Sequence, residues 1–160
     1  MKTAAETAGF IADLAIEHDA AAAFASLLAA EQDALRAGAA ERLETLAREK
    51  MQMASRLEEL AQRRTRYLAA AGFSPDAPGM HAWLASRAQA PGVTGAWQGL
   101  QRLAALARAL NQANGVLIDL HLRHHQQRLA ALNHACGAPG LYGPAGQPLP
   151  RAFARPLTAV

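Results

Sequence analysis

Histidine side chains near the C-terminal end of this chain have the spacing that metal binding would need. His121 and His125 are four residues apart, so on a helix they would share a face and could hold one divalent ion. A catalytic zinc site also needs a third protein ligand and an open position, and the glutamate that follows the first histidine in zinc proteases is missing. The run is therefore interpreted as a solvated basic face, and we expect no metal and no cofactor.

The sequence does not support nucleophilic or acid–base catalysis either. Cys136 is the only cysteine, and it lacks an evident catalytic base and activating environment. Carboxylates of the first half pair readily with basic residues three or four positions away, as Glu44 does with Arg48, which is typical of surface ion pairs. The Glu-x-x-His motif of di-iron helical bundles does not occur. We predict that the protein is not an enzyme, and the single cysteine favours a reducing, cytoplasmic location.

Two asparagines and a glycine interrupt a long predicted helix that has no proline. Glycine in a helix costs about 1 kcal/mol relative to alanine, and asparagine adds a further cost. Asn111 and Asn114 would lie one turn apart, where a buried asparagine fixes helix register, and Gly115 would let another backbone approach closely. Two interpretations stay open, a polar contact between helices of one molecule or a site that binds a partner.

A lone tyrosine, Tyr142, follows in a segment rich in proline and glycine. It either folds back over the end of the preceding helix or docks in a pocket of a partner, where a phenol buries area and donates one hydrogen bond. The segment has few large apolar side chains, so we expect residues 137–160 to form a flexible tail after a helical domain of residues 1–136.

The prolines divide the chain into helical stretches, because none occurs before Pro75 or between Pro91 and Pro139. Alanine and leucine dominate and aromatic residues make up only 5%, which predicts a thin seam between closely packed helices. The expected fold is all-α, an elongated antiparallel helical hairpin with a long third helix, as in a three-helix bundle or coiled coil. The expected helices are residues 7–37, 40–71, 80–89 and 95–136.

Cap and seam residues refine this expectation. Gly38 is expected to end the first helix in a left-handed conformation, and Thr94 to cap the start of the last. Leucines of the second helix alternate spacings of three and four, which predicts a coiled-coil seam. Lys50 and Arg64 fill two seam positions, so their charged ends are expected to meet acidic residues of the first helix such as Glu31. The seam is Leu43, Leu46, Lys50, Met53, Leu57, Leu60, Arg64 and Tyr67.

Charge is divided unevenly along the chain. Residues 1–62 carry six basic and eleven acidic side chains, whereas residues 63–160 carry ten basic and two acidic ones. The basic half could meet an acidic partner, but its arginines are scattered and few aromatic residues could stack on bases, so we expect no nucleic acid. The longest uncharged run, residues 129–150, holds four prolines and four glycines and is not expected to insert stably in a membrane.

These residues together resemble the FlgN family of bacterial flagellar export chaperones over about residues 20–147. One departure is Ala145, where the family usually has an acidic residue or asparagine, and the stretch from Trp83 to Trp97 matches no hallmark. In the expected hairpin, the matching residues are Glu31 and Leu35 of the first helix, the leucines and Lys50 of the second, and the end of the hairpin at Leu68–Gly72. The other two matching motifs are Asn-x-x-Asn-Gly-x-Leu-Ile at 111–118 and Tyr-Gly-x-x-Gly-Gln at 142–147.

The resemblance implies a cytoplasmic chaperone that binds hook-filament junction proteins, keeps them unassembled and escorts them to the flagellar type III export gate and its ATPase apparatus. It implies that Asn111, Asn114 and Gly115 form the helix signature and that Tyr142 docks on the gate. Two alternatives remain: a non-catalytic coiled-coil adaptor that forms a homodimer through the seam without a cargo role, and a bundle that binds nucleic acid. The implied cargo surface is Leu117, Ile118, Leu129 and Leu132.

Overall fold

The computed structural model describes residues 3–86 and 91–135, and all regular structure in these two ranges is helical. The all-α prediction is confirmed. The chain divides into two compact units, residues 1–118 and 119–160, and the fourth helix contributes to both. The helices are α1 (Ala4–Ala37), α2 (Ala40–Ala70), α3 (Ala77–Ala85) and α4 (Pro91–Ala135).

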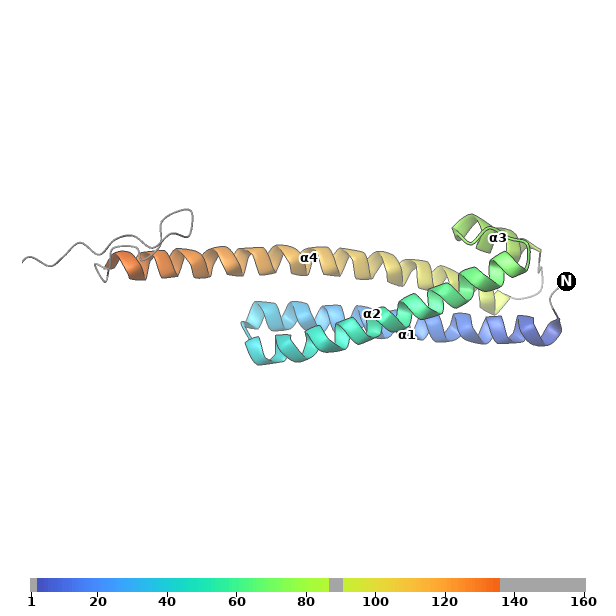
Figure 1. The fold of residues 1–160 in the computed structure, drawn as a ribbon, viewed down its shortest axis with the longest axis horizontal. Helices are drawn as coiled ribbons and strands as arrows, with labels where there is room; N and C mark the ends of the chain where they lie inside the picture. The colour runs from blue at the N-terminus through green and yellow to red at the C-terminus, as the bar shows by residue number, and fades with distance from the viewer. Residues whose placement is uncertain (1–2, 87–90, 136–160) are drawn as a thin grey trace, which may run out of the picture. The chain divides into compact units, whose positions relative to one another are not determined.

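The hairpin of α1 and α2 forms as expected, with the two helices side by side and antiparallel (Figure 1). α1 begins at Ala4, three residues earlier than predicted, because Thr3 forms a capping box. Its hydroxyl accepts from the Glu6 backbone N–H at 3.2 Å, and the Glu6 carboxylate accepts from the Thr3 backbone N–H at 2.8 Å. Gly38 ends the helix with φ 66°, which confirms the predicted left-handed cap.

The hairpin seam contains both apolar and charged pairs. Leu46, Leu60 and Leu68 of α2 are buried against α1. The two cationic seam positions are matched by α1: Lys50 Nζ lies 2.6 Å from Glu31 Oε1, and Arg64 Nε lies 3.0 Å from a carboxylate oxygen of Glu17. The expectation that these side chains meet acids of the first helix is confirmed, and the seam is thereby occupied within the chain.

The short helix α3 closes the open end of the hairpin. Asp76 caps it by accepting from the Gly79 backbone N–H at 2.8 Å, so the helix starts at Ala77, earlier than predicted. Gly79 is required there, because a Cβ would lie only 1.8 Å from the Ser74 carbonyl oxygen. α3 contributes two fully buried side chains, Met80 and Trp83, to the core.

Aromatic rings gather at this end of the hairpin. The rings of Phe10 and Tyr67 stack at a centroid distance of 4.0 Å, and Trp83 meets Phe10 edge-on at 4.8 Å. The Tyr67 hydroxyl lies 3.2 Å from the Thr7 hydroxyl. The segment that matched no family hallmark therefore contributes Trp83 and Trp97 to the main core of residues 1–118.

α4 starts at Pro91, and proline suits the first turn of a helix, where its missing N–H costs no hydrogen bond. The predicted cap at Thr94 is therefore wrong, because this residue lies inside the helix. Val93, Trp97 and Leu100 of α4 are buried in the main core. None of the described helices is long and apolar enough to cross a membrane.

Candidate functional site

Asn114 is the most deeply buried polar residue of α4, with 1% of its surface exposed. Its side-chain Nδ2 donates to the Leu28 carbonyl oxygen at 2.9 Å and to Glu31 Oε2 at 2.8 Å. Because Glu31 Oε1 also binds Lys50, one α1 carboxylate joins all three long helices. Of the two interpretations left open for this asparagine, the polar contact between helices of one molecule is the one observed.

The other two residues of the signature behave differently. Asn111 is exposed on α4, one turn before Asn114. A Cβ placed on Gly115 would meet nothing within 4 Å. No second backbone of the described residues approaches Gly115, so the role expected for it stays a prediction about a partner. Gly99, by contrast, is closely approached by a side chain, because a Cβ there would lie 2.7 Å from His18 Nε2.

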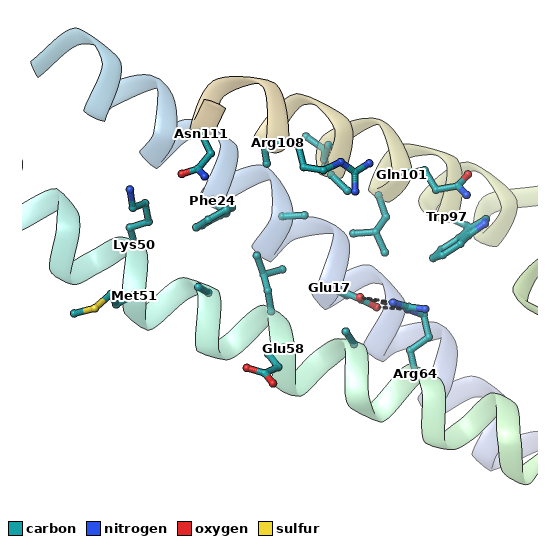
Figure 2. Close-up of a pocket in the computed structure, with 18 residues that line it drawn as sticks. Glu17, Phe24, Lys50, Met51, Glu58, Arg64, Trp97, Gln101, Arg108 and Asn111 are labelled. Carbon is teal, nitrogen blue, oxygen red and sulfur yellow. Dashed lines mark hydrogen bonds and ion pairs between the residues drawn. The ribbon is translucent and has the colours of Figure 1, made fainter. Parts of the chain in front are cut away.

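A groove of about 660 Å³ lies between α2 and α4 with α1 as its floor (Figure 2). We call it the interhelical groove. Lys50 and Asn111 lie toward one end, and Trp97 and the Glu17–Arg64 ion pair lie toward the other. Its apolar and small side chains are Ala21, Phe24, Met51, Ala54, Leu57, Ala61, Trp97, Leu100, Leu103, Ala104 and Ala107.

Some of the charged side chains that border this groove have an ion-pair partner, and others do not. Arg64 is held by the Glu17 carboxylate, and its guanidinium also lies 5.1 Å from the centre of the Trp97 ring. Arg108 is exposed and has no hydrogen-bond or ion-pair partner among the described residues. Glu58 on the α2 side is exposed and accepts only a long, 3.4 Å hydrogen bond from Gln62. The groove is thus apolar within and bears opposite charges on its two walls.

A row of large apolar side chains lies exposed on the second part of α4. Ile118, Leu122, Leu129 and Leu132 are 40%, 55%, 61% and 59% exposed. Their spacings of four, seven and three place them on one helical face. Leu100, which packs in the core of residues 1–118, lies on the same face of α4. We call these four side chains the α4 apolar row.

The predicted cargo residues are thus placed in two environments. Ile118, Leu129 and Leu132 belong to the exposed row, whereas Leu117 is partly buried. Tyr142, predicted to dock on the gate, lies outside the described residues, as does the predicted tail, residues 137–160.

The sequence did not reveal the interhelical groove. The best signal in the sequence was the pair of small residues Ala104 and Ala107, three positions apart in the last helix, which face the groove opposite partly buried Leu57. Small residues at seam positions predict close helix packing as readily as a gap, so the pattern alone does not separate the two. Among the described residues, no three His, Cys, Asp or Glu side chains are placed to hold a metal ion.

Comparison with known proteins gives one result. The family described as FlgN protein matches residues 1–150, which is most of the 160-residue chain. Searches of curated proteins and of solved structures found no match.

Proposed function

Because this chain belongs to the FlgN family of flagellar export chaperones, we propose that it binds hook-filament junction proteins in the cytoplasm before their export. In this proposal it keeps these subunits unassembled and delivers them to the flagellar type III export gate and its ATPase apparatus. The terminal segments of such subunits must associate strongly in the finished filament, so an escort has to cover apolar surface that would otherwise self-associate.

The α4 apolar row is the observation that carries the proposal. Four large apolar side chains on one face, each at least 40% exposed, would be a solubility hazard without a partner. Exposed apolar positions at helical spacing suit an amphipathic helix of the cargo, which would bury its own apolar face against them. We therefore assign Ile118, Leu129 and Leu132 to cargo binding and extend the set to Leu122. Leu117, which is partly buried, would contribute from the edge of the row.

The coiled-coil adaptor alternative is disfavoured by the hairpin itself. Its dimer would use the α2 seam, but Lys50 and Arg64 of that seam are paired with acids of α1. Leu46 and Leu60 of the same seam are buried. A dimer through this surface would require the hairpin to open and leave buried charges without partners, which costs several kcal/mol.

Calorimetric titration with the C-terminal segment of a hook-filament junction protein from the same organism tests the proposal. We expect one-to-one binding with a negative change in heat capacity, because apolar surface is buried as the segment folds. Absence of binding at high micromolar concentration, together with a concentration-dependent dimer, would favour the adaptor alternative. Retention on DNA that falls steeply with salt would favour the nucleic-acid alternative.

Delivery is assigned to the tail, with Tyr142 as the docking group on the export gate. The Tyr142→Ala variant is expected to weaken binding to the gate and to leave cargo affinity unchanged. Tyr142→Phe is the matched control, since it keeps the ring and removes only the hydroxyl. If Tyr142→Ala weakens gate and cargo binding equally, the division of labour between helix and tail is wrong.

A further inference from the structure

The interhelical groove is apolar surface that the hairpin and α4 leave unfilled. Phe24 and Leu57 are only partly buried, although they lie between helices that pack around them. The groove volume of about 660 Å³ falls within the range of ligand-binding pockets in proteins. Its position lies within residues 1–118, on a different set of side chains from Leu122, Leu129 and Leu132.

The lining allows a helix backbone to come close. Alanines are present on both walls, Ala54 and Ala61 on α2 and Ala104 and Ala107 on α4. Small side chains leave room for the large apolar residues of an inserted helix, as in other helix-in-groove complexes. Two flanking cations, Lys50 and Arg64, are already neutralised by buried carboxylates.

The two walls offer opposite charges to an occupant. Arg108 on the α4 wall has no partner among the described residues, and Glu58 on the α2 wall has only the weak contact with Gln62. A complementary helix would carry an acidic side chain along one border of its apolar stripe and a basic one along the other. Polyanions such as nucleic acid do not fit, because Glu58 would repel them.

We propose that the interhelical groove binds one amphipathic helix of the export cargo, with its apolar stripe against Phe24 and Leu57 and an acidic side chain paired with Arg108. This inference rests on the proposed chaperone function and adds a second cargo contact to the α4 apolar row. Two separate contacts of moderate strength would hold the cargo firmly in the cytoplasm and release it one contact at a time at the gate.

Variants that fill the groove test the proposal in the full chain. Ala54→Trp and Ala104→Trp each place a large ring in it, and Ala70→Trp and Ala105→Trp place the same ring on exposed positions of the same helices outside it. We expect the groove variants to weaken calorimetric affinity for the junction-protein segment by about tenfold. The outside variants should bind like wild type. Equal affinity of all four variants and wild type would overturn the proposal.

Charge reversal provides a second test that does not depend on packing. Arg108→Glu should weaken cargo binding, whereas Arg102→Glu, an exposed arginine of α4 outside the groove, should not. Thermal unfolding of each variant by circular dichroism shows whether the fold is kept. If a tryptophan variant unfolds, the comparison of Arg108→Glu with Arg102→Glu tests the proposal instead. Equal cargo affinity of these two variants would overturn it.

Other occupants give distinct results. If the groove variants convert a dimer to a monomer in sedimentation without changing cargo affinity, the occupant is a second copy of the chain. If they alter cargo affinity only while residues 137–160 are present, the occupant is the tail. Either result overturns the cargo proposal while leaving the proposed function intact. Failure of wild-type protein to bind cargo would instead remove the proposed function itself.

Discussion

Asn114 shows how one polar residue can set the position of a helix. Its amide donates both to the Leu28 carbonyl and to the Glu31 carboxylate, and the carboxylate in turn holds Lys50. Asn114 Oδ1, in contrast, is buried without a hydrogen-bond donor among the described residues. A residue that leaves one buried polar atom unsatisfied is a poor choice for stability alone, so its value lies in fixing the register of α4 on the hairpin.

Asn114→Ala is expected to lower the free energy of unfolding by about 1–3 kcal/mol, because two buried hydrogen bonds are lost and Glu31 keeps only its Lys50 partner. Urea unfolding followed by circular dichroism measures this loss. The control is Asn111→Ala, an exposed position one turn away, where we expect a change within about 0.5 kcal/mol. Equal losses at both sites would mean that the observed hydrogen bonds do not account for the role of Asn114.

Two of the glycines of α4, Gly115 and Gly99, should respond differently to alanine. Gly115→Ala is expected to raise the free energy of unfolding by about 0.5–1 kcal/mol, since the new methyl group meets nothing and helix propensity improves. Gly99→Ala should give no gain, because its methyl group would press on the His18 ring. Thermal and urea unfolding compare the two. Loss of stability in Gly115→Ala would revive the idea that a backbone packs against this glycine.

At the scale of helices, much of the fold could be predicted from the sequence. Proline spacing located the long helices, Gly38 marked the end of α1, and the charged seam positions predicted ion pairs with α1. Boundaries moved where a cap had been overlooked, as with Thr3, whose capping box with Glu6 extends α1 backward, and Asp76, which starts α3 early. The Thr3-x-x-Glu6 spacing is a sequence signature of a capping box, so this boundary could have been predicted from the sequence.

The aromatic core and the groove could not be predicted in this way. Phe10, Tyr67 and Trp83 lie far apart in the sequence, and only the path of the chain brings their rings together. The same holds for Phe24 and Leu57, which line the groove from different helices. Periodicity assigns a face to each side chain but does not say how closely two faces will pack.

The cap of α3 gives this element a pH dependence. Hydrogen bonds lower the pKa of Asp76 below its ordinary value. The largest effect comes from the Gly79 backbone N–H and the next from the Ser74 side chain. A lowered pKa in the folded state adds stability that is present above the unfolded pKa, about 3.9, and is lost as pH falls through the folded value.

Asp76→Asn keeps a cap acceptor and removes the titrating group. We therefore expect the wild type to exceed this variant in free energy of unfolding by more at pH 6 than at pH 3. Urea unfolding at the two pH values measures both differences. A difference that stays constant between them would show that the charge of Asp76 does not stabilise the cap.

At the scale of the whole molecule, the family match and the described structure support different parts of the account. The match over residues 1–150 places the chain among flagellar export chaperones. The structure adds the helical hairpin with its aromatic core, and an exposed apolar row on α4. The family resemblance implied three of the four row residues, Ile118, Leu129 and Leu132, as cargo surface, and Leu122 was added from its exposure.

The measurement that tests the central claim most directly compares cargo binding by two double variants of α4. The first variant, Leu129→Asp with Leu132→Asp, places two aspartates in the apolar row. The second, Gln127→Asp with Ala130→Asp, places two aspartates at the same spacing on the opposite face of α4, where both residues are exposed. Calorimetric titration with the junction-protein segment should show affinity lost in the first variant and kept in the second. Equal binding by both variants would contradict the assignment of the α4 apolar row to cargo.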